Sequence, residues 1–171
     1  MRKIEDIQEL RQIQMGILDE VHRFCEAHGL RYFLSSGTLI GAVRHKGYIP
    51  WDDDIDIYMP RKDYEEFLQT YTSDSGHYRA INPQTEQHYY YTFAKVVDLR
   101  TRMVEKETAG YEIGVYMDIF PVDYVTDDLQ ERERIFKKKK LLYKIRRCKI
   151  SKNNYLRSRL AYYVYKNWPM S

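Results

Sequence analysis

The segment that decides the fold is residues 36–57, which read SGTLIGAVRHKGYIPWDDDIDI. Its last part alternates aspartate with isoleucine, as a half-buried strand does, because successive side chains of a strand point to opposite faces. This alternation predicts a strand with Asp54 and Asp56 on one face and the two isoleucines on the other. Asp53 shares the parity of the isoleucines and Asp52 precedes the regular strand, so we expect neither to be a metal ligand.

Two carboxylates on one face of a strand lie about 7 Å apart and repel each other unless a cation compensates them. Mg²⁺ or Mn²⁺ suits this role, because hard divalent cations prefer carboxylate oxygen. A third carboxylate comes from Asp118, which alternates with apolar residues in GVYMDIF at 114–120. We therefore predict that Asp54, Asp56 and Asp118 are the catalytic residues and the metal ligands. A solvated acidic turn is the alternative, whereas an EF-hand is excluded because its required glycine is missing.

The turn at the start of the quoted segment has the composition of an anion site. Ser36, Gly37 and Thr38 follow an expected short strand over residues 32–34 and lead into an expected helix over 38–45. Backbone N–H groups at a helix start bind phosphate, and glycine lets the phosphate come close to the backbone. We predict that these three residues bind phosphate, with a plain helix cap as the alternative. A turn of this kind followed by paired aspartates is typical of nucleotidyltransferase-fold enzymes.

The rest of the chain predicts an α+β fold, a small mixed sheet backed by helices. An apolar stripe of helical period predicts a first helix that stops at His28-Gly29. The other expected elements are a helix over 61–71, strands over 89–97, 101–105 and 114–120 with an antiparallel connection at Leu99-Arg100, and two basic helices at the end.

Composition and charge limit the possible classes of protein. The 171 residues are 43% hydrophobic and 31% charged, which indicates a folded chain, and the two cysteines lack the spacing of a zinc cluster. Residues 1–131 hold 14 Lys+Arg and 24 Asp+Glu, a net of −10, whereas residues 132–171 hold 14 and 1, a net of +13. We expect a catalytic domain over 1–131 and a basic helical extension over 132–171 that suits an anionic surface. The alternative is that the two parts neutralise each other within the fold.

Residues 36–57 closely resemble the LicD family, which is similar in fold to nucleotidyltransferases and includes phosphocholine transferases and relatives of fukutin. Further matches are RKDY at 61–64, KVVD at 95–98 and YMDIFP at 116–121, so the resemblance covers roughly residues 30–125. It implies a nucleotidyltransferase-like mixed sheet. It also implies metal-dependent transfer of a phospho-alcohol, with phosphocholine favoured, from a CDP-activated donor such as CDP-choline to a glycan hydroxyl, with release of CMP.

Three cations are assigned to the donor phosphates under this resemblance. Arg44 and Lys46 lie between the glycine turn and the aspartates, and Lys95 lies on an expected strand. Gly41 is a second candidate for the phosphate-binding role of Gly37, because the turn lies further from the paired aspartates than in many nucleotidyltransferases.

The resemblance also implies where the protein acts. The acceptor would be a cell-surface glycan, as in lipopolysaccharide or teichoic acid synthesis, or its lipid-linked precursor. We therefore expect a cytoplasmic protein whose basic segment contacts the anionic inner face of the membrane. Nucleic acid is not expected as a partner, because the acidic body would repel it. Two other functions stay open, a true nucleotidyltransferase that releases pyrophosphate and a non-catalytic anion-binding module.

Overall fold

The computed structural model describes residues 4–86, 89, 91–104 and 112–150. The helices are α1 (Ile7–His28), α2 (Ser36–Ile40), the π-helical turn η1 (Gly41–His45), α3 (Arg61–Thr70) and α4 (Leu129–Ile150). The strands are β1 (Phe33–Leu34), β2 (Asp56–Pro60), β3 (Tyr78–Ile81), β4 (Ala94–Asp98), β5 (Met103–Val104), β6 (Glu112–Ile113) and β7 (Tyr116–Val122). The α+β fold class predicted from the sequence is confirmed.

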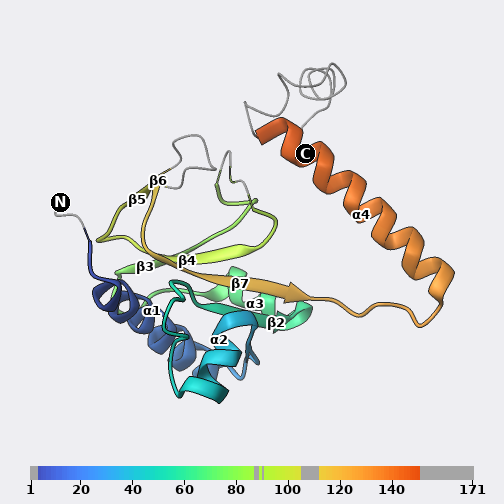
Figure 1. Ribbon diagram of the computed structural model, residues 1–171. Coiled ribbons are helices and arrows are strands. Elements are labelled where there is room, and N and C mark those ends of the chain that lie inside the picture. The colour runs from blue at the N-terminus through green and yellow to red at the C-terminus, as the bar shows by residue number, and fades with distance from the viewer. Residues whose placement is uncertain (1–3, 87–88, 90, 105–111, 151–171) are drawn as a thin grey trace. The chain divides into compact units, whose positions relative to one another are not determined.

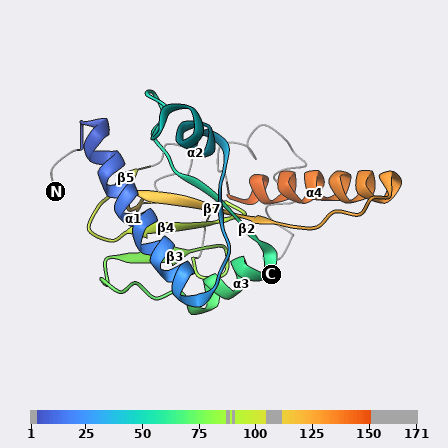
Figure 2. The same cartoon turned by 90° about the horizontal axis from the view of Figure 1, so that it is seen from below.

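A five-stranded mixed sheet, in the order β1-β2-β7-β4-β3, forms the centre of the fold. β2 and β7 run parallel, and the other neighbouring strands are antiparallel. β5 and β6 form a separate two-stranded sheet. Figures 1 and 2 show α1 and α3 on the same face of the larger sheet, so these two helices cover one side of it.

The hydrophobic core lies between this sheet and the two helices. Its buried side chains come from α1, α3 and alternate positions of the three central strands, among them Ile17, Val21, Phe24, Phe67, Ile57, Met59, Val96, Met117 and Ile119. Because side chains alternate along a strand, the residues between these positions face the other side of the sheet. Asp56 of β2, Asp118 of β7 and Lys95 of β4 are on that second face.

The first helix forms as the sequence predicts but buries a different set of residues. Asp6 caps its start by accepting from the N–H of Gln8, and Gly29 ends it in the left-handed conformation with φ 66°. Its first half buries Arg11 and Gln14, whereas Ile7, which the apolar stripe assigned to the core, is 37% exposed. Arg11 and Gln14 are buried because their side chains donate hydrogen bonds to carbonyl oxygens of the loop over residues 49–53.

Several strand predictions need correction. The antiparallel connection at Leu99-Arg100 is wrong, because β4 pairs with β3 and β7 while β5 pairs with β6. The strand expected over 89–97 begins only at Ala94, and β3 was not predicted at all. Of the two basic helices, the first is α4, and the second lies outside the described residues.

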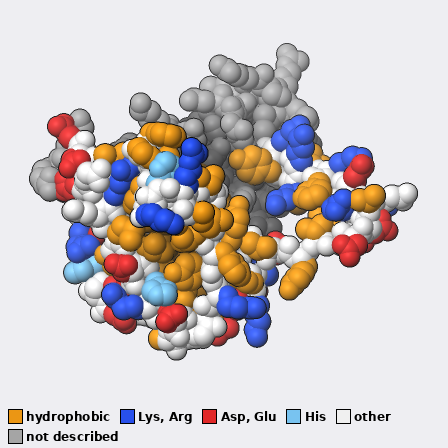
Figure 3. Space-filling model, turned by 60° about the horizontal axis from the view of Figure 1, so that its bottom comes forward, with side chains coloured by type: hydrophobic (Ala, Val, Ile, Leu, Met, Phe, Trp, Pro, Cys, Tyr) orange, Lys and Arg blue, Asp and Glu red, His pale blue; other side chains and the backbone are white. Residues whose placement is uncertain are grey.

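The chain divides into two compact units. The first unit, called the body below, holds α1 to α3 and all of the strands, and the second contains α4. The Asp128 carboxylate caps α4 by accepting from the N–H groups of Gln130 and Glu131. Figure 3 shows lysine and arginine side chains interspersed with hydrophobic ones along this helix. Within the part of the chain that the structure describes, no helix is both long and apolar enough to cross a bilayer.

The cap of α1 provides a test of the fold. Gly29→Ala should lower the free energy of unfolding by about 1–2 kcal/mol, because an L-residue is strained in the left-handed conformation. Added methyl groups at Gly29 and Gly47 would both meet open space, but Gly47 does not have a positive φ. Gly47→Ala is therefore the matched control and should be neutral in urea unfolding. Equal effects of the two changes would contradict the capping role.

Candidate active site

Two of the predicted acids face each other across neighbouring strands. Asp56 and Asp118 are register partners in the parallel pair of β2 and β7, and the Asp118 N–H donates to the Ile55 carbonyl oxygen at 2.9 Å. Ile55 and Ile57 are buried, whereas Asp54 and Asp56 are half-buried, as the predicted alternation requires. The core therefore fixes both strands and places these carboxylates on the face of the sheet opposite α1 and α3.

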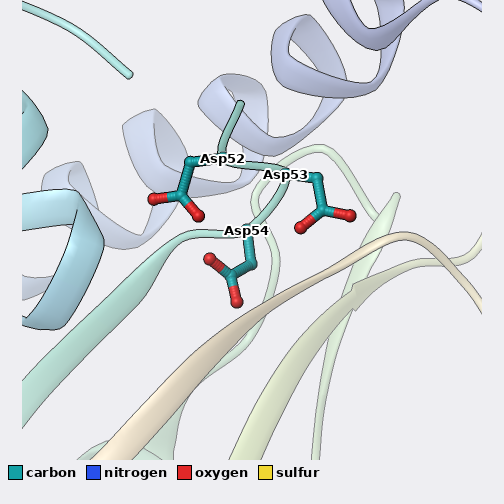
Figure 4. A group of neighbouring side chains, drawn as sticks. All are labelled: Asp52, Asp53 and Asp54. Atoms are coloured by element: carbon teal, nitrogen blue, oxygen red, sulfur yellow. The ribbon is translucent and has the colours of Figure 1, made fainter. Parts of the chain in front are cut away.

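A loop next to these strands gathers further acids. One carboxylate oxygen from each of Asp52, Asp53 and Asp54 lies within 4.8 Å of the others, and Figure 4 shows the three side chains leaving one short loop beside α1. The sequence analysis did not expect Asp52 and Asp53 in this group. Its alternation rule applies to a regular strand, and β2 begins only at Asp56.

The loop is held by two buried residues of α1. The Arg11 guanidinium donates from Nη2 to the carbonyl oxygens of Ile49, Pro50 and Asp52 at 2.8–2.9 Å. Gln14 Nε2 donates to the Asp53 carbonyl oxygen at 2.8 Å. Sequence reasoning missed both residues. Their only signal was a pair of polar side chains, three positions apart, on the same helix face as Ile17 and Val21.

The crowding of acids shifts their pKa values. Burial, followed by the nearby charges of Asp56, Asp52 and Asp53, raises the pKa of Asp54 to about 6. Burial also raises the pKa of Asp56, although a hydrogen bond from Ser36 opposes this shift. Carboxylates with raised pKa values are common in functional sites. These groups would be stabilised in their charged form by a cation.

Lys95 lies in the site, but its ammonium contacts an acid. Lys95 Nζ donates to Asp118 Oδ1 at 2.6 Å, and the lysine is 1% exposed. The ammonium also lies 3.3 Å from the ring centroid of Tyr116 and 4.3 Å from that of Tyr91. Burial raises the pKa of Asp118 even though the Lys95 charge lowers it. In this structure Lys95 therefore holds Asp118, and its predicted role toward the donor phosphates stays a prediction.

The predicted phosphate turn packs directly on the acids. Ser36 has the left-handed φ of 49°, which is uncommon for a residue other than glycine, and its side chain hydrogen-bonds Asp56. Thr38 Oγ1 accepts from the Asp56 N–H at 2.9 Å. A side chain at Gly37 would collide with the Asp52 carboxylate. The structure thus brings Ser36, Gly37 and Thr38 to the aspartates, and phosphate binding by this turn stays a prediction.

The other glycine and the two cations lie further along the same segment. Gly41 is buried, and a Cβ there would collide with the Gly47 carbonyl oxygen and press on the backbone of Tyr48 and Ile49. This close packing explains why position 41 is glycine, and a phosphate-binding role of Gly41 in place of Gly37 stays a prediction. Arg44 is exposed on η1, and Lys46 follows it with φ 58°.

Comparison with known proteins identifies the family. The family model described as LicD/FKTN/FKRP, nucleotidyltransferase domain, matches residues 29–158. The chain belongs to the LicD family. The family resemblance seen in the sequence is therefore confirmed.

Three relatives differ in how much of the LicD-family chain they match. The lipopolysaccharide cholinephosphotransferase LicD of Haemophilus influenzae is 37% identical over 130 residues, which are 75% of this chain and 48% of that protein. The human ribitol 5-phosphate transferase FKRP is 41% identical over 51 residues, 30% of this chain and 10% of that protein. Mannosyltransferase regulator 4 of Saccharomyces cerevisiae is 33% identical over 72 residues, 42% of this chain and 6% of that protein. The chain thus spans about half the length of the bacterial relative.

The acids should respond to loss of their charge to different extents, because Asp118 contacts a lysine. At pH 8, Asp54→Asn should raise the free energy of unfolding by about 1 kcal/mol, a value that allows for solvent screening. The change removes a charge that burial and three neighbouring carboxylates disfavour. This gain should shrink as the pH falls through about 6, where the folded wild type takes up the proton. It should vanish below about pH 4, where the unfolded chain is protonated as well.

Asp118→Asn should give a smaller gain at pH 8, because burial disfavours the Asp118 charge, as its raised pKa indicates, whereas the Lys95 charge favours it. The buried Lys95 ammonium would lose the carboxylate charge that it contacts. Urea unfolding at pH 8, 6 and 4 measures both effects, with exposed Asp74→Asn as the neutral control. A gain for Asp118→Asn as large as that for Asp54→Asn, or a gain for Asp54→Asn that does not depend on pH, would contradict this account of the site.

Proposed function

We propose that this LicD-family chain transfers a phospho-alcohol from a CDP-activated donor to a hydroxyl of a glycan or of its lipid-linked precursor. The observation that carries the proposal is the meeting of Asp56 and Asp118 on paired strands, with the acidic loop and the Ser36–Thr38 turn beside them. The relatives support this reaction class, because one is named a cholinephosphotransferase and another a ribitol 5-phosphate transferase. Phosphocholine is the favoured group, since the cholinephosphotransferase matches 75% of the chain.

The reaction is a displacement at phosphorus. A bond forms between the acceptor oxygen and the donor phosphorus that bears the alcohol, and the phosphoanhydride bond to CMP breaks. The hydroxyl proton goes to a carboxylate oxygen or to solvent, and CMP leaves. The Ser36–Thr38 turn, Arg44 and Lys46 are our candidates for holding the donor phosphates.

The donor set fits a hard divalent cation. Asp54, Asp56 and Asp118 offer carboxylate oxygens whose pKa values are raised by burial and by neighbouring aspartates, which is the environment that a cation relieves. These three residues would hold Mg²⁺ or Mn²⁺, with Asp52 and Asp53 at hand in the loop. Such an ion, when bound, neutralises charge on the diphosphate and on the leaving oxygen. Ser36 and Lys95 then orient Asp56 and Asp118 by direct hydrogen bonds.

The nature of the released product tests this function. The full chain, with Mn²⁺ or Mg²⁺ and a glycan acceptor panel, should release CMP from CDP-choline and no pyrophosphate from nucleoside triphosphates. Asp56→Asn should reduce CMP release by about a thousandfold and weaken Mn²⁺ binding in paramagnetic resonance titrations. The exposed Asp74→Asn should leave both unchanged. Pyrophosphate release would favour the nucleotidyltransferase, and binding without any product would favour the non-catalytic module.

Peripheral membrane contact is the second part of the proposal, and it concerns α4. Residues 132–171 hold 14 Lys+Arg and 1 Asp+Glu, a charge that suits anionic lipid at the cytoplasmic face. The full chain should bind vesicles that contain phosphatidylserine, more weakly at high salt, and neutral vesicles poorly. Changing Lys137, Lys138, Lys139 and Lys140 together to Gln should weaken this binding by about a hundredfold. Equal binding to neutral and anionic vesicles would leave the helix without this role.

A further inference from the structure

A pocket of about 360 Å³ lies beside the acidic loop, entirely within the body of the protein. Apolar side chains from three elements and the acidic segment form most of its wall, namely Met15, Leu18, Leu34, Ala42 and Ile55. This volume and lining are typical of a site for a small molecule or for one part of a larger one. Ile55 belongs to the hydrophobic core and Leu18 and Leu34 pack against it, whereas neither the core nor the catalytic site accounts for Met15 and Ala42.

Few polar side chains line the pocket, and they are placed unevenly. Asp52 contributes a carboxylate from the acidic loop, and Lys46 contributes the only cation among the lining residues that the structure describes. The Tyr48 hydroxyl donates to Gln14 Oε1 at 3.0 Å, so the hydroxyl is engaged in the body and the ring is what lines the pocket. Thr38, also in the wall, accepts from the N–H of Asp56. One hydrogen bond therefore links the pocket to the predicted metal ligands.

We propose that this pocket binds the quaternary ammonium head group of the alcohol that the donor carries. This inference rests on the proposed function and names the alcohol that the site selects. Methyl groups on nitrogen need apolar surface, which Met15, Leu18 and Leu34 provide. Their positive charge needs a carboxylate nearby, and Asp52 provides one. The Tyr48 ring contributes apolar surface, since the Arg11 guanidinium already lies over it at 4.9 Å from its centroid.

The charges of the pocket match a zwitterion better than a simple cation. In phosphocholine a phosphate follows the ammonium after two carbons, so a single site must offer one negative and one positive group. Asp52 and Lys46 are such a pair on one pocket wall. Lys46 is exposed, so its ammonium can stay at the mouth with the phosphate while the trimethylammonium enters the apolar part.

A polyol suits the same pocket poorly. Each hydroxyl of ribitol that enters must give up water, and an apolar wall of Met, Leu, Ala and Ile offers no hydrogen bond in return. Ribitol should therefore bind more weakly than choline, because each buried hydroxyl is desolvated without a partner. The proposal therefore predicts selection of choline over ribitol.

The test adds a positive charge to the pocket wall at an exposed position. Met15 is 41% exposed on α1 and lines the pocket, whereas Ile7 is 37% exposed on the same helix and does not. Met15→Lys should weaken binding of tetramethylammonium to the full chain by about tenfold in calorimetry or NMR titration, through repulsion in an apolar site. Ile7→Lys should leave the affinity unchanged. Met15→Leu, which keeps the apolar wall, should retain it.

A second variant and a second ligand keep the proposal open to refutation. Ala42→Leu should also reduce tetramethylammonium affinity, because the larger side chain takes up part of the pocket, and it replaces Met15→Lys if that variant does not fold. In turnover, both should raise the KM for CDP-choline and leave the KM for CDP-ribitol unchanged. Two outcomes would overturn the proposal. In the first, Met15→Lys weakens binding of ribitol 5-phosphate as strongly as it weakens binding of tetramethylammonium. In the second, these variants leave tetramethylammonium binding unchanged.

The outcomes separate this inference from the proposed function. CMP release from CDP-choline without an effect of Met15→Lys would refute the head-group pocket and leave the transferase intact. Tetramethylammonium binding that Met15→Lys abolishes, with no CMP release from any CDP-alcohol, would support the pocket and refute the transfer reaction. Displacement by a simple alkyl alcohol with equal potency would show that the pocket receives an apolar chain, which also contradicts the proposal.

Discussion

The site depends on the Arg11 guanidinium, which pins the acidic loop to α1. Its three accepting carbonyl oxygens belong to Ile49, Pro50 and Asp52, consecutive or nearly so in the chain, so the loop must turn around a single buried group. The Ile49 carbonyl oxygen also accepts from the Asp52 N–H at 3.0 Å, so a backbone turn and the guanidinium together satisfy the loop. A buried carbonyl left unpaired would cost about 1–3 kcal/mol. The direction in which Asp52, Asp53 and Asp54 leave the loop follows from this anchoring. An apolar residue at position 11 could pack against α1's neighbours but could not define that direction.

A second constraint comes from the parallel pairing of β2 and β7. Their register places Asp56 against Asp118, and the buried isoleucines on the reverse side hold both strands in that register. Packing of the core thus holds like charges together against their repulsion. Ser36 hydrogen-bonds Asp56 and Lys95 hydrogen-bonds Asp118, which lessens that repulsion. Repulsion that the fold tolerates in this way is characteristic of sites in which a ligand supplies the missing charge.

Local pattern was enough to predict the segments whose structure is determined locally. The alternation around Asp54 and Asp56, the stop at Gly29 and the helix after Pro60 all have short-range causes, and all are present. Strand partners were not predictable in this way, because β4 pairs with β7 and β3 rather than with β5, the strand that follows it along the chain. The role of Arg11 was not predictable from local pattern either. Its hydrogen-bond partners lie about 40 residues further along the chain, and only folding brings them together.

The position of β7 in the sheet also bears on how the protein is made. β7 lies at the centre of the five-stranded sheet, yet it is the last of the described strands along the chain. Until residues 116–122 leave the ribosome, β2 and β4 each lack β7, the partner that will later lie between them. Unpaired strand edges invite association with other chains. Insertion of a central strand requires contacts between distant segments, which form slowly. In a nascent chain Asp56 therefore lies on the open edge strand β2 before β7 and its Asp118 are available to pair with it. The negative charge of Asp56 discourages another chain from pairing with that strand.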